Sequence, residues 1–323
     1  MNPDPIDLRE YPHGIYGLDS GYVRPRLDAI HFIVEKGRVA FIDTGTNDSV
    51  PRMLEALSRL GLDADAIDYV IPTHVHLDHA GGAGRLMQLA HNAKMVIHPR
   101  GAGHMIDPSK LWAGTVGVYG EARARRDYGE LVPVPRERVI EAPDGASISL
   151  AGRKLVFLDT PGHAKHHFCV WDESARALFT GDTFGCSYRE LDDADGRAHM
   201  FASTTPTQFD PPALRASIDR LLALGPEAIY VTHYSRITDV ERLGVDLRRV
   251  VDGHEAIGLR WADCGDAAER ERGLKQGVED LARAEARRAG GDEALWIKVL
   301  ENDIALNAQG IAAWLDFRSK KAA

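Results

Sequence analysis

The sequence has few cysteines. Its 323 residues contain three, Cys169, Cys186 and Cys264, an odd number at wide intervals. Disulfide-stabilised secreted domains need paired cysteines, and zinc ribbons need closely spaced pairs. We therefore predict neither a disulfide framework nor a Cys-x-x-Cys zinc site. A reducing cytoplasm is the expected location.

Long apolar runs and a surplus of basic residues are also missing. No apolar stretch approaches the roughly 20 residues that cross a bilayer, and residues 1–5 lack the basic start of a secretory signal. The formal net charge of -9 disfavours a general grip on the phosphate backbone of nucleic acid. We therefore expect a soluble, cytoplasmic protein with a small-molecule substrate, and neither a nucleic-acid nor a membrane partner.

The most informative segment is residues 73–82, THVHLDHAGG, which places three imidazoles and one carboxylate within six positions. The preceding residues 66–72 predict a buried strand, and the two glycines allow a tight turn into a helix. His74, His76 and Asp78 then leave the strand end at intervals of two, while His79 lies on another face. One tetrahedral ion could not easily accept all four side chains from so short a stretch, so the spacing favours two adjacent metal ions.

This run resembles the H-x-H-x-D-H signature of the metallo-β-lactamase superfamily. Segments resembling the family's other motifs follow its order, and the resemblance covers roughly residues 12–240. They are FIDTG at 41–45, TPGH at 160–163, TGD at 180–182 and VTH at 231–233. The resemblance implies an α/β fold, a four-layer αββα sandwich, with the metal ligands gathered at strand ends.

The resemblance also implies a ligand set. The first metal would be held by His74, His76 and His163, the second by Asp78, His79 and His233, and Asp182 would bridge the two. Zinc is the expected metal, with manganese and iron as alternatives. Such a pair lowers the pKa of a shared water and supplies a hydroxide nucleophile, so Asp78 and Asp182 are assigned catalytic roles. Asp43 is expected to orient a ligand histidine.

Three functions remain open from the sequence. The first is a dinuclear metal-dependent hydrolase that uses a metal-bridging hydroxide on a small ester, lactone or thioester. The second is an iron-dependent oxidoreductase resembling persulfide dioxygenases. The third is a binding protein that keeps the metal as a structural staple. Three further side chains near the motifs are weaker candidates for substrate contact: His166, Tyr188 and Tyr234.

Periodicity along the chain predicts strands that alternate with helices. A hairpin is expected over 29–42, an amphipathic helix begins near Pro51, and a second begins at Pro211. We predict a metallo-β-lactamase-fold domain over 1–246 and a helical extension over 247–323 that packs on the main domain or forms a homo-oligomer. Residues 101–138, polar and broken by glycine, are either a candidate cap insertion over the metal site or a plain surface excursion.

Overall fold

The structure is a computed structural model that describes residues 6–204 and 208–322. The chain divides into two compact units. The first unit comprises the described part of Met1–Asp159 with His166–Gly181 and Pro226–Thr238, and the second comprises Thr160–Lys165 with the described parts of Asp182–Gly225 and Asp239–Ala323. Residues 1–5, on which the expected lack of an export signal depends, lie outside the described residues.

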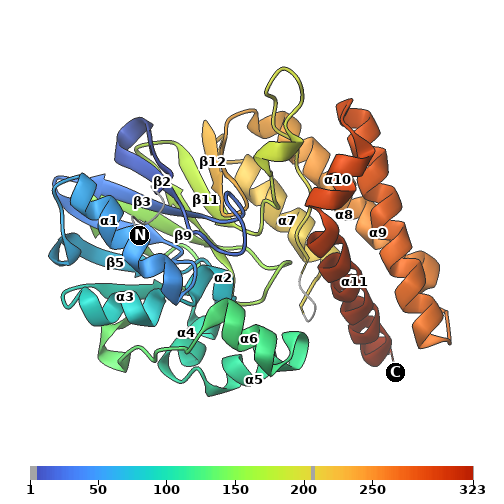
Figure 1. The fold of residues 1–323 in the computed structure, drawn as a ribbon, viewed down its shortest axis with the longest axis horizontal. Coiled ribbons are helices and arrows are strands. Elements are labelled where there is room, and N and C mark those ends of the chain that lie inside the picture. Colours follow the sequence, from blue (N-terminus) through green and yellow to red (C-terminus); the bar gives the residue numbers. More distant parts are fainter. Residues whose placement is uncertain (1–5, 205–207, 323) are drawn as a thin grey trace. The chain divides into compact units, whose positions relative to one another are not determined.

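The described part of the first unit contains two mixed sheets (Figure 1). The first sheet has the order β1 (Leu8–Tyr11), β2 (Ile15–Asp19), β3 (Ala29–Glu35), β4 (Arg38–Ile42), β5 (Ile67–Ile71), β6 (Lys94–Ile97) and β7 (Val139–Glu141). The second sheet has the order β13 (Ser235–Ile237), β12 (Ala228–Val231), β11 (Ala177–Gly181), β10 (Phe168–Asp172), β9 (Arg153–Asp159) and β8 (Ser147–Leu150). The hairpin predicted over 29–42 is confirmed as the antiparallel pair β3 and β4.

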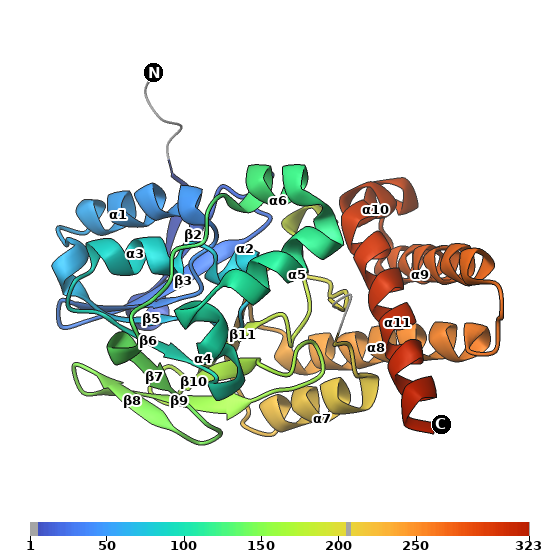
Figure 2. The same cartoon turned by 90° about the horizontal axis from the view of Figure 1, so that it is seen from below.

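Both faces of the first sheet are buried. Along β4, Val39 and Phe41 join a core with the helices, while Ala40 and Ile42 join a core with the second sheet. This alternation follows from the two-residue period of a strand. The helices on the first face are α1 (Val50–Arg59), α2 (Leu77–Ala80) and α3 (Ala83–Leu89), and Figure 2 shows α1 and α3 side by side over the strands. The amphipathic helix predicted near Pro51 is thereby confirmed.

Residues 101–138 contain more regular structure than their composition predicts. They hold most of α4 (Pro99–Ile106), then α5 (Ser109–Tyr119) and α6 (Glu121–Tyr128). Glycine lowers helix propensity, but burial of Ala102, Met105 and Ala124 offsets that loss. Gly101 is also required by packing, because a Cβ atom there would lie 2.9 Å from Cγ1 of Val75.

The described helices of the second unit are α7 (Pro211–Leu222), α8 (Val240–Trp261), α9 (Ala267–Ala289), α10 (Glu293–Val299) and α11 (Glu301–Ala322). The helix predicted from Pro211 is confirmed as α7. At Gly273 in α9, a Cβ atom would lie 2.1 Å from the indole of Trp261, so glycine lets α8 and α9 approach closely. The division predicted after residue 246 falls inside α8 and stays a prediction, as does a homo-oligomer through these helices. Within residues 6–204 and 208–322, no helix is both long enough and apolar enough to span a bilayer.

The core between the two sheets should dominate the stability of the first unit. Phe157 in β9 is fully buried, and its ring centroid lies 4.8 Å from that of Phe168. We expect Phe157→Ala to lower the free energy of unfolding by about 3–5 kcal/mol, measured by urea denaturation followed by circular dichroism. The matched control is Phe317→Ala, because Phe317 is 46% exposed and its loss should change that free energy by less than about 1 kcal/mol. Equal losses in the two variants would contradict this assignment of the core.

Candidate metal centre

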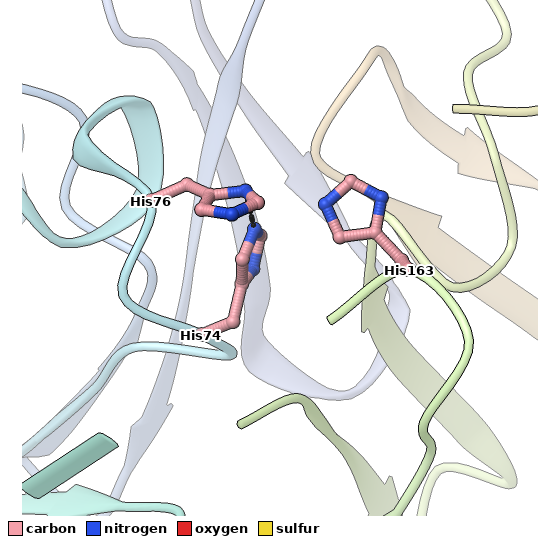
Figure 3. Close-up of side chains that lie close together, drawn as sticks. All are labelled: His74, His76 and His163. Atoms are coloured by element: carbon pink, nitrogen blue, oxygen red, sulfur yellow. Dashed lines mark hydrogen bonds between the residues drawn. The ribbon is translucent and has the colours of Figure 1, made fainter. Parts of the chain in front are cut away.

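The H-x-H-x-D-H segment follows β5 and continues into α2. His74 and His76 lie in the connecting loop, and Asp78 and His79 lie in the short helix. Nε2 of His74 lies 2.8 Å from Nδ1 of His76, and Figure 3 shows the two rings edge to face with this contact dashed. Nδ1 of His74 lies 3.2 Å from the hydroxyl of Thr73, so the ring is fixed from behind. The two facing nitrogens are therefore positioned as a pair of candidate metal ligands, and we use the word donor for such an atom.

A second donor group combines this segment with the end of β12. The carboxylate of Asp78, an imidazole nitrogen of His79 and one of His233 all lie within 4.8 Å of one another. Oδ2 of Asp78 is 3.8 Å from Nε2 of His79 and 3.8 Å from Nε2 of His233. Ligands about 2.0–2.2 Å from a tetrahedral zinc ion lie roughly 3.4 Å apart, so this donor set fits a divalent metal with small adjustments.

Asp43 contacts the residues that carry this group. Its Oδ2 lies 2.8 Å from Nδ1 of His79 and accepts a hydrogen bond from the hydroxyl of Thr232 at 2.8 Å, while its Oδ1 accepts one from the amide of Thr73 at 2.7 Å. Asp43 thus lies against His79, and its role of orienting a ligand histidine stays a prediction. Because the carboxylate holds Nδ1 of His79, Nε2 is the nitrogen directed to the donor group.

Asp28 is a site residue that sequence reasoning missed. Its Oδ1 lies 2.8 Å from Nδ1 of His233, and the same nitrogen is 3.3 Å from the carbonyl oxygen of Leu27. The side chain is fully buried, and burial raises the pKa of Asp28 to about 6 while His233 opposes the rise. The only signal in the sequence is an acidic residue directly before the apolar strand 29–35.

His163 and Asp182 lie together in the second unit. Nε2 of His163 is 3.4 Å from Oδ2 of Asp182, which also accepts a hydrogen bond from the hydroxyl of Ser203 at 3.0 Å. His163, which Figure 3 also labels, follows β9 in the TPGH loop. Gly162 in that loop has φ +133°, and a Cβ atom there would lie 2.3 Å from Cα of Leu214. Glycine is therefore required at the position before His163.

The weaker substrate candidates lie in different surroundings. His166 is nearly buried, with its ring centroid 5.7 Å from that of His76. The hydroxyl of Tyr188 donates a hydrogen bond to Asp303 at 3.2 Å in the second unit. Tyr234 is buried, and desolvation raises its pKa. Their contact with a substrate stays a prediction.

Comparison with known proteins identifies the family. The family model of the metallo-beta-lactamase superfamily matches residues 25–233, which is more than half of the chain. The chain belongs to the metallo-beta-lactamase superfamily. The predicted αββα fold, with further helices at the C-terminus, is confirmed.

Three proteins show how similar this chain is to known relatives in sequence. ST1585, a metallo-beta-lactamase fold-containing protein of Sulfurisphaera tokodaii, is 24% identical over 68% of this chain and 78% of its own length. Its crystal structure has a TM-score of 0.61 with 22% identity, covering 94% of this chain and 99% of that one. A hydroxyacylglutathione hydrolase of Cupriavidus taiwanensis is 30% identical over 69% of this chain and 66% of its length. The acyl-coenzyme A thioesterase MBLAC2 of Gallus gallus is 30% identical over 35% of this chain and 40% of its length. The chain thus spans less than two thirds of either enzyme.

The buried carboxylates behind the imidazoles should control metal affinity. We expect Asp28→Asn to weaken metal binding about 10- to 100-fold, because the amide no longer holds His233 as a charged acceptor does. Competition with a chromophoric chelator measures the affinity. Asp65→Asn, a change at an exposed aspartate, is the matched control and should leave it unchanged. An unaltered affinity in Asp28→Asn would show that Asp28 does not support the site.

Proposed function

We propose that this protein is a dinuclear metal-dependent hydrolase acting on a small thioester, ester or lactone. The observation that carries the proposal is the group of Asp78, His79 and His233, in which a buried carboxylate oxygen lies 2.8 Å from Nδ1 of each imidazole. Such buried pairs direct both Nε2 atoms to one place, as a metal site requires. His74 and His76 supply a neighbouring pair of donors, since the ring centroids of His74 and His79 are 4.1 Å apart.

The positions of His163 and Asp182 within family motifs complete the proposed ligand set. By the family resemblance, His163 would join His74 and His76 as ligands of one metal, and Asp182 would be a ligand shared by both metals. Oδ2 of Asp182 is kept in a defined orientation by the hydroxyl of Ser203. A carboxylate with two oxygens is suited to a bridging role.

Two divalent metal ions bound there would supply hydroxide at neutral pH and polarise the acyl oxygen of the substrate. The chain's own residues would then orient the reacting groups. Asp43 and Asp28 hold the imidazoles in fixed rotamers and tautomers. Asp78, with Oδ2 3.8 Å from both imidazoles, is placed to accept the proton that the attacking water loses.

The names of two relatives favour a thioester among the three substrate classes. One is called a hydroxyacylglutathione hydrolase and the other an acyl-coenzyme A thioesterase. Because the chain spans only part of each, the thiol portion of the substrate is left open. Zinc is the proposed metal.

Metal content tests this proposal first. We expect about two divalent ions per chain, mainly zinc, by elemental mass spectrometry on protein purified without added metal or chelator. The same sample should hydrolyse members of a thioester, ester and lactone panel, and chelation should abolish that turnover. About one iron per chain, with oxygen uptake on persulfide substrates and no hydrolysis, would contradict the proposal.

Single substitutions test the ligand assignment. His74→Ala and Asp182→Ala should each remove metal and activity together, because each deletes a proposed metal ligand on which the hydroxide nucleophile depends. His91→Ala changes an exposed histidine outside the motifs and is the matched control. If Asp182→Ala retained two metals and the full rate, its bridging role would be wrong.

His166 lies beside the donors without belonging to the proposed ligand set. We expect His166→Ala to lower kcat by about tenfold or more while two metals stay bound, since a group that moves a proton acts on turnover and not on metal affinity. Measurement of kcat and metal content on the same sample separates the two effects. Loss of metal from this variant would make His166 a ligand or a support of one.

A further inference from the structure

Ser203 contacts two of the proposed metal ligands at once. Its hydroxyl donates a hydrogen bond to Oδ2 of Asp182 at 3.0 Å, and its carbonyl oxygen lies 3.2 Å from Nδ1 of His163. A carbonyl only accepts hydrogen bonds, so Nδ1 of His163 carries the hydrogen and Nε2 keeps the lone pair that can bind a metal. Nε2 is also the nitrogen that lies 3.4 Å from Oδ2 of Asp182. The position of Ser203 therefore sets the orientation of both side chains.

Asn307 in α11 holds the residues on both sides of Ser203. Its side-chain amide donates a hydrogen bond to the carbonyl of Ala202 at 2.9 Å, and its Oδ1 accepts one from the backbone amide of Thr204 at 2.8 Å. The hydroxyl of Thr204 donates a further bond to the backbone carbonyl of Asn307 at 3.3 Å. Asn307 is 1% exposed, and Ala202 and Thr204 are buried as well. A buried amide that is bonded at both ends fixes the backbone before and after Ser203.

A second contact from α11 reaches the segment that follows the TGD motif. The hydroxyl of Tyr188 donates a hydrogen bond to Oδ1 of Asp303 at 3.2 Å, and Asp303 lies one helical turn before Asn307. A short antiparallel bridge joins this segment to the one that carries Ser203. In it the amide of Cys186 donates to the carbonyl of Phe201 at 2.8 Å, and the amide of Phe201 donates to the carbonyl of Cys186 at 2.9 Å. One turn of α11 therefore holds two segments that are also bonded to each other.

The neighbouring helices of the second unit fix α11 in turn. It lies beside α8 and α9 (Figure 1). A Cβ atom at Gly258 of α8 would lie 2.7 Å from the ring of Trp314 and 2.8 Å from Cγ2 of Ile311, so α8 and α11 are in close contact. Arg270 of α9 forms an ion pair with Asp316 of α11 at 2.9 Å. The helix that carries Asn307 is thus a packed element that can serve as a fixed support.

From these contacts we infer that α11 positions His163 and Asp182 for metal binding, and that Asn307 does so through Ser203. Asn307 lies outside residues 25–233, the part of the chain that the family model matches, so family membership assigns it no role. Ligands that are already held in place lose less conformational freedom when a metal binds, and the support therefore raises metal affinity. The inference rests on the proposed function for the identity of the ligands. Asn307 contacts neither ligand itself and is a positioning residue.

Metal binding by the full-length protein tests this inference independently of turnover. Zinc is titrated in competition with a chromophoric chelator, and cobalt is titrated because its visible absorption reports the geometry of its ligands. The variants are Asn307→Ala, Ser203→Ala, the two combined, and Tyr188→Phe, which removes only the second contact with α11. Ser203→Thr is the conservative variant, because it keeps the hydroxyl. Gln309→Ala is the matched control, because it removes an exposed amide from the same helix. Circular dichroism establishes that each variant is folded.

We expect Asn307→Ala and Ser203→Ala each to bind zinc about tenfold more weakly than wild type and to shift the cobalt absorption. Tyr188→Phe should show a smaller loss in the same direction. Ser203→Thr and Gln309→Ala should stay within about twofold of wild type, as expected where the supporting bonds are kept. Because Asn307 acts through Ser203, the double variant should lose less than the product of the two single losses.

Unchanged zinc affinity and cobalt absorption in folded Asn307→Ala or, if that variant does not fold, in Tyr188→Phe would mark these contacts as purely structural and overturn the inference. Single losses that multiply in full in the double variant would also overturn it, since the two residues would then act separately. A wild type that binds zinc but hydrolyses no thioester, ester or lactone would reject the hydrolase. Weaker zinc binding by Asn307→Ala in that same protein would still support the positioning role.

Discussion

The candidate metal centre depends on the carboxylate of Asp43. This group is almost completely buried and is bonded to Thr73, His79 and Thr232. Those partners follow β5 in the first sheet and β12 in the second, so one side chain joins the ends of strands from both sheets. A buried carboxylate is strongly unfavourable without such partners, and its partners are therefore fixed in position. Asp43 itself has a φ of +58°, an uncommon conformation for a residue other than glycine, at the point where β4 ends.

Asp28 and His233 form a second buried pair, in which Nδ1 of His233 also lies 3.3 Å from the carbonyl oxygen of Leu27. In each pair a fully desolvated carboxylate lies 2.8 Å from Nδ1 of an imidazole whose Nε2 belongs to the donor group with Asp78. Taking a carboxylate out of water is costly, and it is offset only when its hydrogen-bond partners are well placed. The orientation of the two imidazoles is therefore fixed by Asp43 and Asp28, which need not bind a metal themselves.

The motif residues could be predicted from the sequence because their metal-binding side chains are concentrated in short, unusual segments. Sequence reasoning also predicted β3, β4 and β5, since buried strands give continuous apolar runs. It missed β7 and β13, which have three residues each and offer too little pattern. It missed α5 because none of the described residues of that helix is buried, so no apolar period shows. The role of Asp28 could not be predicted from the sequence, because His233 lies far along the chain and only the fold brings the two residues together.

The helices between β6 and β7 occupy a part of the chain that can change separately from the metal-binding motifs. The helices α4, α5 and α6 lie between β6 and β7, and these two strands pair directly in parallel. The sheet register is set by that pairing and not by the length of the connection. The connection can therefore be lengthened, shortened or replaced while the motif segments keep their places on other strands. Apart from Gly101, which packs on Val75, mutations in this connection and mutations that alter the donor set arise in separate stretches of sequence, so the first kind can accumulate during divergence without damage to the second.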